Sequence, residues 1–318
     1  HYRYILGIQS FANMDSGASI VKADVEGNML DYVAISEERL IRKKHPYTFP
    51  LHSIDYCMKY FEIKNIDKID LLVCDWIRKK QWEFSGSTFN VSEYDYLKNI
   101  FLLPKDRVRI ISHHLAHAAS TFYTSGFKKS AILIVDGNGS DLETTSYFEG
   151  NNFKINLIEN FKYYGLGALY NAISTRILNM GTGGEGKTMG LAPYGKKYRN
   201  LGIKIPYYSK GIVNDFSEFM ERMPFSDILN QINAKYRVDP ISINYRVAKK
   251  KNDVLKSYFS GTAYNLQNTL EKVIIKLAQD LHNKTKSDNL SIAGGVGLNS
   301  VANKKILDKT KFKDIFIF

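Results

Sequence analysis

Cysteine is scarce in this sequence: only Cys57 and Cys74 occur among 318 residues, and they form no C-x-x-C pair. This scarcity excludes a disulfide framework and a cysteine-based zinc knuckle, and it favours a reducing compartment. Long hydrophobic runs are missing as well, because no apolar stretch approaches the roughly 18 residues of a membrane span. The opening YILGIQSF leads into polar residues and not into a signal-peptide cleavage region. We therefore expect a cytoplasmic protein without a membrane partner.

Clustered charge of one sign is also rare, although the formal net charge is +12. Lysines and arginines are mixed with acidic residues, and only residues 42–44 and 249–251 form basic runs. Such runs are typical of solvated faces, so they do not indicate a nucleic-acid partner. With 44% hydrophobic residues over 318 positions, the chain has the length for a large core and about two domains.

Short strands and helices alternate along the chain. Three strand-like runs open it, and a turn at Gly27-Asn28 separates the second from the third: YILGIQS, ASIVKAD and LDYVAIS. The theme returns over residues 131–161 as a buried strand, a loop with Asp, Gly and Ser, and a hairpin. This repetition predicts a duplicated α/β fold whose loops offer backbone N–H groups to anionic oxygens. Two unrelated hairpins with ordinary turns are the alternative.

The second half of the chain contains several distinct segments, and LGALYNAISTRIL (166–178) predicts an amphipathic helix. GTGGEGKTMGLAPYGKK (181–197) predicts a glycine-rich loop, which lacks the spacing of a P-loop. Residues 197–252 are rich in Lys and Tyr and are typical of an insertion, and residues 258–284 predict a long helix. Residues 291–307 predict a strand, a glycine turn and a helix, an order that lets backbone N–H groups approach a phosphate.

Three of the seven histidines lie within the six residues HHLAHA. His113 and His117 are four positions apart, so a helix places them on one face, whereas His114 points elsewhere. Asp136 ends the buried strand that follows and adds a carboxylate. Two imidazoles and one carboxylate suit Fe(II), Zn(II) or Mn(II). A purely structural histidine pair, satisfied by backbone carbonyl groups, is the alternative.

Four segments together carry a family resemblance: ISEERLIRKKH (35–45), HHLAHAASTFYTSGF (113–127), GEGKTMGLAPYG (184–195) and SIAGGVGLNSVANKKIL (291–307). In these segments the chain resembles the O-carbamoyltransferase family, which includes nodulation-type and antibiotic-tailoring enzymes. The resemblance implies a Kae1-like amino-terminal domain with the two-lobed fold of actin, Hsp70 and sugar kinases. It also implies a carboxy-terminal YrdC-like domain.

The resemblance also predicts the domain organisation. We expect the first actin-like lobe over residues 1–127 and the second over residues 128–318, with the insertion at 197–252. The chain stops at KFKDIFIF, where members of the family continue into a Gly/Asp loop with a further metal-binding aspartate and then the YrdC-like domain. We therefore expect a truncated sequence without the YrdC-like domain.

The chemistry that the resemblance implies is a two-step transfer. The YrdC-like domain condenses carbamoyl phosphate with ATP to carbamoyladenylate. The Kae1-like domain then passes the carbamoyl group to a hydroxyl of a small acceptor such as a sugar or natural product. By the same resemblance a metal, typically iron, binds at His113, His117 and Asp136 and contacts the nucleotide phosphate.

The resemblance assigns further residues to the nucleotide and to the reaction. The expected nucleotide-binding residues are Gly137, Gly139, Glu185, Gly190, Gly294, Gly295, Gly297 and Asn299. Asn13, Asp15 and Lys187 are the expected catalytic residues; Lys187 is expected over the same site, with a surface lysine as the alternative. In FANMDSGAS, Asn13 stands where relatives often carry a histidine that contacts the carbamoyl group, two residues before Asp15. Asn13 can donate a hydrogen bond to a developing oxyanion, but it cannot act as a general base near neutral pH.

Three other protein classes fit parts of the pattern. A Kae1-type tRNA-modifying transferase shares the fold and the histidine pair, whereas an actin-like ATPase or sugar kinase has no need of that pair. A non-catalytic nucleotide-binding scaffold fits the replacement of histidine by Asn13. The acceptor is expected to face the insertion, because aromatic side chains stack on sugars and rings; its tyrosines are Tyr207, Tyr208, Tyr236 and Tyr245.

Overall fold

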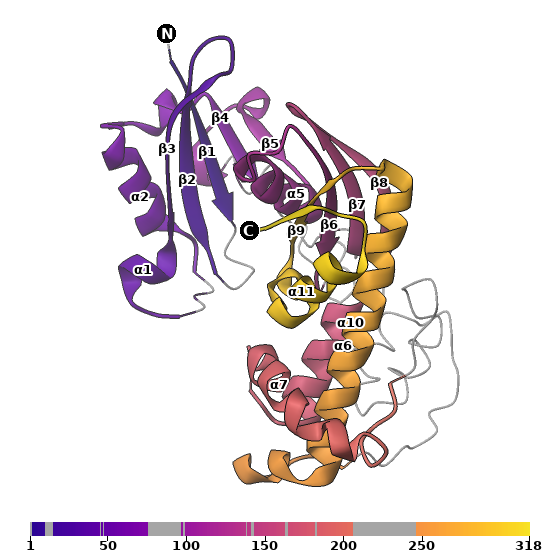
Figure 1. The fold of residues 1–318 in the computed structure, drawn as a ribbon. Helices are drawn as coiled ribbons and strands as arrows, with labels where there is room; N and C mark the ends of the chain where they lie inside the picture. Colours follow the sequence, from indigo (N-terminus) through magenta and orange to yellow (C-terminus); the bar gives the residue numbers. More distant parts are fainter. Residues whose placement is uncertain are drawn as a thin grey trace, which may run out of the picture. The chain divides into compact units, whose positions relative to one another are not determined.

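The protein is described by a computed structural model. It covers residues 2–9, 15–44, 46, 48–75, 97, 99–137, 139–140, 143–162, 165–181, 183–205 and 246–318. The backbone forms two compact units, His1–Ala116 and His117–Phe318, whose elements are drawn in Figure 1. The boundary falls inside helix α5 (His113–Thr124), where the sequence placed the end of the first lobe at residue 127.

The first unit is built on a five-stranded sheet in the order β3-β2-β1-β4-β5. Its strands are β1 (Arg3–Gln9), β2 (Gly17–Ala23), β3 (Met29–Ser36), β4 (Leu71–Cys74) and β5 (Val108–Ile110). The first three strands form an antiparallel meander, whereas β4 runs parallel to β1 and β5 runs parallel to β4. The predicted meander at the start of the chain is therefore confirmed.

The second unit repeats this arrangement. Its sheet has the order β8-β7-β6-β9-β10. The strands are β6 (Lys129–Val135), β7 (Glu143–Asn151), β8 (Lys154–Lys162), β9 (Asn289–Ala293) and β10 (Asp314–Ile317). Again three strands form an antiparallel meander and two follow in parallel. The same order and the same strand directions in both units confirm the predicted α/β fold, a duplicated ribonuclease H-like fold of the actin and sugar-kinase type.

Two helices of the first unit pack on strands β2 and β3. Helix α2 (Leu51–Tyr60) packs on β2 and β3 and buries Ile54 and Cys57 in the core. Helix α1 (Glu37–Ile41) follows β3 directly. Ser36 still has extended dihedral angles and is the residue before the first helical turn. Two short 3₁₀ turns, Ile66–Lys68 and Lys105–Arg107, lead into β4 and β5.

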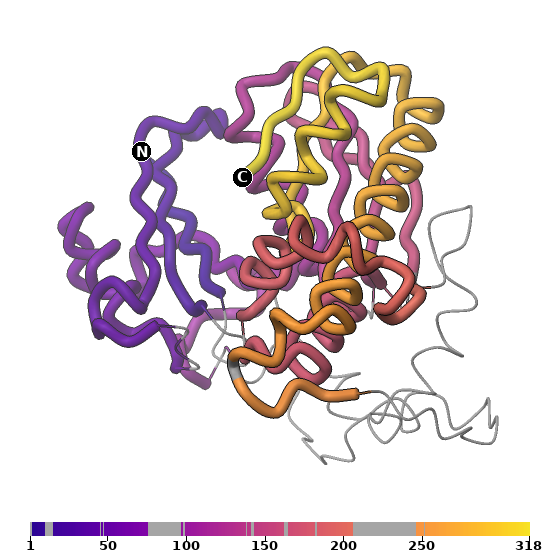
Figure 2. Tube along the Cα trace, turned by 60° about the horizontal axis from the view of Figure 1, so that its bottom comes forward, coloured from indigo at the N-terminus to yellow at the C-terminus, as the bar shows by residue number. Residues whose placement is uncertain are grey.

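Both faces of the second sheet are covered. Every residue of β6 after Lys129 is buried, as expected of a strand between two helical layers. Phe122 of α5 packs against Gly150 of β7, where an added Cβ would lie 2.5 Å from the phenyl ring. Helix α10 (Ser257–Thr285) contacts β6 and runs beside α11 (Ser300–Lys309) in Figures 1 and 2. None of the described helices has both the length and the apolar character to cross a membrane.

Two segments of the second unit differ from the sequence prediction. The helix predicted for LGALYNAISTRIL is α6 (Leu166–Ala172) followed by a π-helical turn at Ile173–Ile177. The predicted glycine-rich loop is wrong over much of its length, because it forms α7 (Glu185–Leu191) and a 3₁₀ segment at Ala192–Tyr198. Thr188 and Leu191, three positions apart, are both buried and give α7 its packed face. Of the predicted insertion, residues 206–245 lie outside the described residues.

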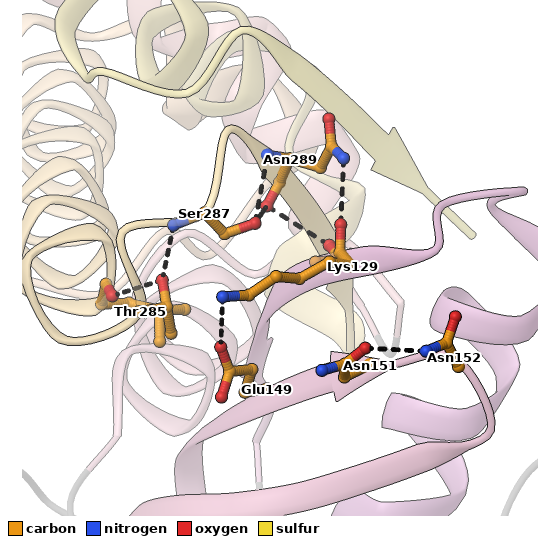
Figure 3. A network of polar contacts seen from close by, with 9 residues as sticks. Lys129, Glu149, Asn151, Asn152, Thr285, Ser287 and Asn289 are labelled. Atoms are coloured by element: carbon orange, nitrogen blue, oxygen red, sulfur yellow. Dashed lines mark hydrogen bonds and ion pairs between the residues drawn. The ribbon is translucent and has the colours of Figure 1, made fainter.

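A polar network fixes one end of the second sheet, as Figure 3 shows. The side-chain amide of Asn289 donates to the backbone carbonyl of Lys129 over 2.9 Å, and the ammonium of Lys129 lies 3.1 Å from the carboxylate of Glu149. The hydroxyl of Ser287 donates to the carbonyl of Asn289 at 3.0 Å, and its N–H donates to the hydroxyl of Thr285 at 3.3 Å. These contacts join the end of α10 to the first residues of β9 and β6.

Candidate metal centre

Helix α5 carries the two histidines of the predicted metal site. The hydroxyl of Ser112 accepts a hydrogen bond from the N–H of Leu115 over 3.2 Å, so a side-chain cap starts the helix just before His113. His113 and His117 follow at a spacing of four residues and share one face of the helix. His114 is buried, in agreement with the expectation that it points elsewhere.

Asp136 is the residue that follows β6, and its carboxylate has two different environments. Its Oδ1 accepts hydrogen bonds from the N–H groups of Gly137 at 2.7 Å and Gly295 at 3.2 Å. Its Oδ2 lies 3.1 Å from Nε2 of His117. The backbone therefore holds one oxygen, and this leaves the second oxygen directed at the imidazole.

The predicted ligands His113, His117 and Asp136 form the one group of metal-ligand type among the described residues. Each offers a ligand atom, and these atoms lie within 4.8 Å of one another. Two ligand atoms about 2.1 Å from one ion and at a right angle lie about 3 Å apart, and the 3.1 Å between His117 and Asp136 has this value. The donor set and its spacing therefore fit a divalent ion of the Fe, Zn or Mn type.

His113 has a carboxylate partner that the sequence analysis did not identify. Its Nδ1 lies 2.9 Å from Oδ2 of Asp75, the residue after β4. The contact was missed because the partners are 38 positions apart in sequence. The available signal was that Asp75 ends the buried run IDLLVCD, as Asp136 ends AILIVD.

The glycine turn after β9 approaches the end of β6 closely. Gly294 has φ +92°, and an added Cβ would lie 2.5 Å from the carbonyl oxygen of Val135. The next residue, Gly295, donates its N–H to Asp136, and the N–H of Gly297 donates to the carbonyl of Gly294 at 2.9 Å. The turn thus supports the candidate ligand Asp136, whereas the nucleotide contacts expected of these glycines stay predictions.

The side chain of Asn299 is engaged inside the second unit. Its Oδ1 accepts the N–H of Ala302 at 3.1 Å and caps α11, and it also exchanges hydrogen bonds of 3.0 Å with Gln267 of α10. Tyr170 of α6 donates to Oε1 of Gln267 at 2.9 Å. Burial, with the charge of Glu271, raises the pKa of Tyr170, so the hydroxyl stays a donor. The nucleotide contact expected of Asn299 stays a prediction beside this packing role.

The residues predicted on α7 have local partners. The amide of Asn171 donates to the carboxylate of Glu185 at 2.5 Å, and the ammonium of Lys187 donates to the carbonyl of Met180 at 3.1 Å. Gly190 lies in the same helix, with open space where a Cβ would be. Their proposed nucleotide or catalytic roles stay predictions.

The loop residues predicted near the carbamoyl group are only partly described. Asn13 lies outside the described residues. Asp15 is exposed and has φ +71°, a left-handed conformation that is uncommon for a residue other than glycine. In the loop after β6, Gly137 faces open space, and the N–H of Gly139 donates to the carbonyl of Glu143 at 2.7 Å.

Known proteins resemble this chain over nearly its whole length. The uncharacterized protein sll1178 of Synechocystis sp. is 29% identical, over 99% of this chain and 54% of that protein. The nodulation protein NolNO of Sinorhizobium fredii is 28% identical, over 96% of this chain and 44% of that protein. Among solved structures, HypF of T. kodakarensis matches with a TM-score of 0.49 and 12% identity, over 99% of this chain and 45% of that one. The chain spans about half or less of the length of these curated relatives.

The family comparison covers the parts of the chain that form the candidate site. Residues 4–318 match the family described as carbamoyltransferase N-terminus. The matched range includes both sheets, the histidine pair of α5, Asp136 and the glycine turn after β9. The resemblance inferred from the sequence motifs is therefore confirmed, and the chain belongs to the carbamoyltransferase N-terminus family.

Proposed function

We propose that the chain is the carbamoyl-transfer part of an O-carbamoyltransferase and binds a divalent metal, in the first place Fe(II), through His113, His117 and Asp136. The observation that carries this proposal is the grouping of two imidazoles and one carboxylate within 4.8 Å, in a chain of the carbamoyltransferase family. Two histidines and a carboxylate with open positions are a donor set that suits Fe(II) and leaves room for a substrate.

The protein's own groups prepare this site before a metal binds. Gly137 and Gly295 hold one oxygen of Asp136 with their N–H groups, so the other oxygen keeps its direction toward His117. The rigid helix keeps His113 and His117 one turn apart. Because these positions are fixed by the fold, little side-chain freedom is lost when the ligands close on an ion.

The proposed donor of the carbamoyl group is carbamoyladenylate, made from carbamoyl phosphate and ATP by a YrdC-like domain. A bound divalent ion supplies Lewis-acid polarisation and neutralises charge on a phosphate. We assign the nucleotide to the glycine turn at Gly294-Gly295 and to the loop at Gly137 and Gly139, because Gly137 and Gly295 both donate their N–H groups to Oδ1 of Asp136. Glu185, Gly190, Gly297 and Asn299 complete the proposed nucleotide-binding set.

The proposed reacting groups come from the loop after β1 and from α7. Asn13 donates a hydrogen bond to the carbamoyl oxygen, and Asp15 and Lys187 are the other proposed catalytic residues. The acceptor is a small molecule with a free hydroxyl, a sugar or another natural product. Because Cys57 and Cys74 are buried as thiols and not joined in a disulfide, the proposal places the reaction in a reducing, cytoplasmic compartment.

Metal analysis of ligand variants tests this proposal. The chain is reconstituted with Fe(II) without oxygen and desalted, and its iron is measured by mass spectrometry. Wild-type protein should retain about one equivalent, whereas His113→Ala, His117→Ala and Asp136→Asn should retain little, because each removes one of three ligands. The same proteins are then titrated with AMP by calorimetry, and metal-loaded wild type should bind it more tightly than metal-free wild type.

The matched control is His282→Gln, which removes a histidine from the last turn of α10, far along the chain from the candidate ligands. It should retain iron like wild type. Circular dichroism on all variants shows whether the fold is kept. Equal iron content in the three ligand variants and in wild type would exclude this metal site. Equal AMP affinity of metal-loaded and metal-free protein would exclude the proposed contact between the metal and the nucleotide.

A further inference from the structure

Asp75 and His113 form a close pair within the first unit. Asp75 follows β4 directly, and its Oδ2 lies 2.9 Å from Nδ1 of His113. Their side chains are 14% and 17% exposed, so both are largely shielded from water. A hydrogen bond between a carboxylate and an imidazole is stronger and better oriented in such surroundings than on an open surface.

The direction of this hydrogen bond decides which nitrogen of His113 carries the proton. An ionised carboxylate only accepts hydrogen bonds, so Nδ1 of His113 carries the proton. In a neutral imidazole the second nitrogen, Nε2, then keeps its lone pair. Asp75 thereby selects the tautomer that can bind a metal through Nε2 and also fixes the rotation of the ring.

Among the described residues, His113 is the side chain with which Asp75 forms a hydrogen bond. Its second oxygen, Oδ1, is buried and accepts no hydrogen bond within the part of the chain that the structure describes. Asp70, at the start of the same strand, is different, because it accepts the backbone N–H of Tyr4 at 2.8 Å and so supports the pairing of β1 with β4. Asp70 therefore stabilises the backbone of the sheet, whereas Asp75 binds the imidazole of His113.

We infer that Asp75 is a positioning residue that orients His113 and sets its tautomer for metal binding. This inference rests on the proposed metal centre, since it requires that His113 is a ligand. Asp75 is not itself among the three grouped ligands. Carboxylates that orient ligating histidines are a common feature of metal sites, and their removal typically lowers metal affinity about 10- to 100-fold.

Cobalt binding separates this role from a merely structural one. Co(II) replaces Fe(II) as the probe, because its visible absorption reports ligand geometry and its affinity is measured by competition with a chelator. Asp75→Ala should weaken Co(II) binding about 10- to 100-fold and change the visible spectrum. Asp75→Asn should fall between Ala and wild type, because its amide oxygen still accepts the Nδ1 proton but carries no charge. Urea unfolding of each metal-free variant measures stability in parallel.

Two further variants make the outcome decisive. Asp70→Ala should reduce the stability of the metal-free protein and leave the cobalt affinity and spectrum as in wild type. His113→Ala should lose cobalt binding altogether. Wild-type affinity in Asp75→Ala, with binding lost in His113→Ala, would overturn the positioning role alone. Wild-type affinity in both would overturn the metal centre itself, and equal affinity losses in Asp75→Ala and Asp70→Ala would show a general structural effect and overturn the inference.

Discussion

Replacing Glu37 with Gln is expected to destabilise the protein by about 3 kcal/mol. Glu37 is 1% exposed and its carboxylate accepts four hydrogen bonds. His52 donates from Nδ1 at 2.6 Å and from its N–H at 3.2 Å, and Ser53 donates from its hydroxyl at 2.7 Å and from its N–H at 2.8 Å. Helix α2 begins after Pro50, which offers no side-chain cap, so Glu37 caps this helix from another segment.

The magnitude follows from the donors that Gln leaves unsatisfied. A glutamine has one accepting oxygen, and its NH₂ group faces donors where the second carboxylate oxygen was. Each buried donor left without a partner costs about 1–3 kcal/mol. The lost negative charge near the N-terminus of α2 removes about 0.3–1 kcal/mol more. The exposed ring of His52 can turn toward water and recover part of the lost hydrogen bonding. The expected destabilisation is therefore near the lower end of these contributions, at about 3 kcal/mol.

The effect should depend on pH in a definite direction. Burial raises the pKa of Glu37, but the hydrogen bonds from Ser53 and His52 lower it more, so the folded-state pKa lies below the ordinary value. A carboxyl group with a lowered pKa stabilises the folded state above its unfolded pKa of about 4.3, and this contribution is lost as the pH falls through the folded pKa. Glu37→Gln should therefore differ most from wild type near neutral pH and progressively less below about pH 4.

Urea unfolding, followed by circular dichroism between about pH 3 and pH 7, measures this difference. Glu62→Gln is the matched control, because Glu62 is exposed, and it should unfold like wild type at every pH. A difference between Glu37→Gln and wild type that stays constant with pH would refute the role of the charge. An equal loss in Glu62→Gln would refute the role of the buried cap.

Three further changes test other parts of the fold. Gly294→Ala should cost at least about 2 kcal/mol more in urea unfolding than Gly27→Ala, because both residues have φ +92° but only Gly294 faces a backbone carbonyl within 2.5 Å; similar losses would contradict the close approach. Gln267→Leu should cost about 2–3 kcal/mol in the same assay, because buried partners on α6 and at the start of α11 lose their hydrogen bonds. A neutral effect would show that these partners find others. Burial raises the pKa of Cys57 to about 11, so its thiol should react with a disulfide reagent at about pH 8 only after unfolding, and rapid reaction of the native protein would contradict its burial.

Local patterns in the sequence were sufficient for most of the fold. The strand at Lys129–Val135 is an unbroken apolar run and Asp136 marks its end, so both the element and the candidate ligand could be predicted. The prediction of a glycine-rich loop was wrong because it gave weight to the glycines and none to Thr188 and Leu191. These two residues are three positions apart and both buried, which is the pattern of a packed helix. Here packing against the core outweighed the low helix propensity of glycine.

Contacts between segments that are distant in the sequence could not be predicted from local patterns. Asp75 meets His113 only because β4 ends near the start of α5, and no local spacing links residues 38 positions apart. The resemblance assigned Asn299 to the nucleotide, whereas its observed partner Gln267 lies 32 positions away in the sequence. Polar residues at strand ends can therefore be recognised as candidates, but the fold decides whether they face a ligand or one another.

The two oxygens of Asp136 connect two regions of the second unit thermodynamically. One oxygen binds the N–H of Gly295 in the turn after β9, and the other faces His117 on α5. A ligand that takes the N–H of Gly295 removes one of the two backbone N–H groups that Oδ1 of Asp136 accepts, and so alters the carboxylate of the proposed metal centre. By linkage, a metal at the proposed centre would change the affinity of the glycine turn for the proposed nucleotide by the same factor. In the proposed function, this single carboxylate therefore couples metal binding to nucleotide binding.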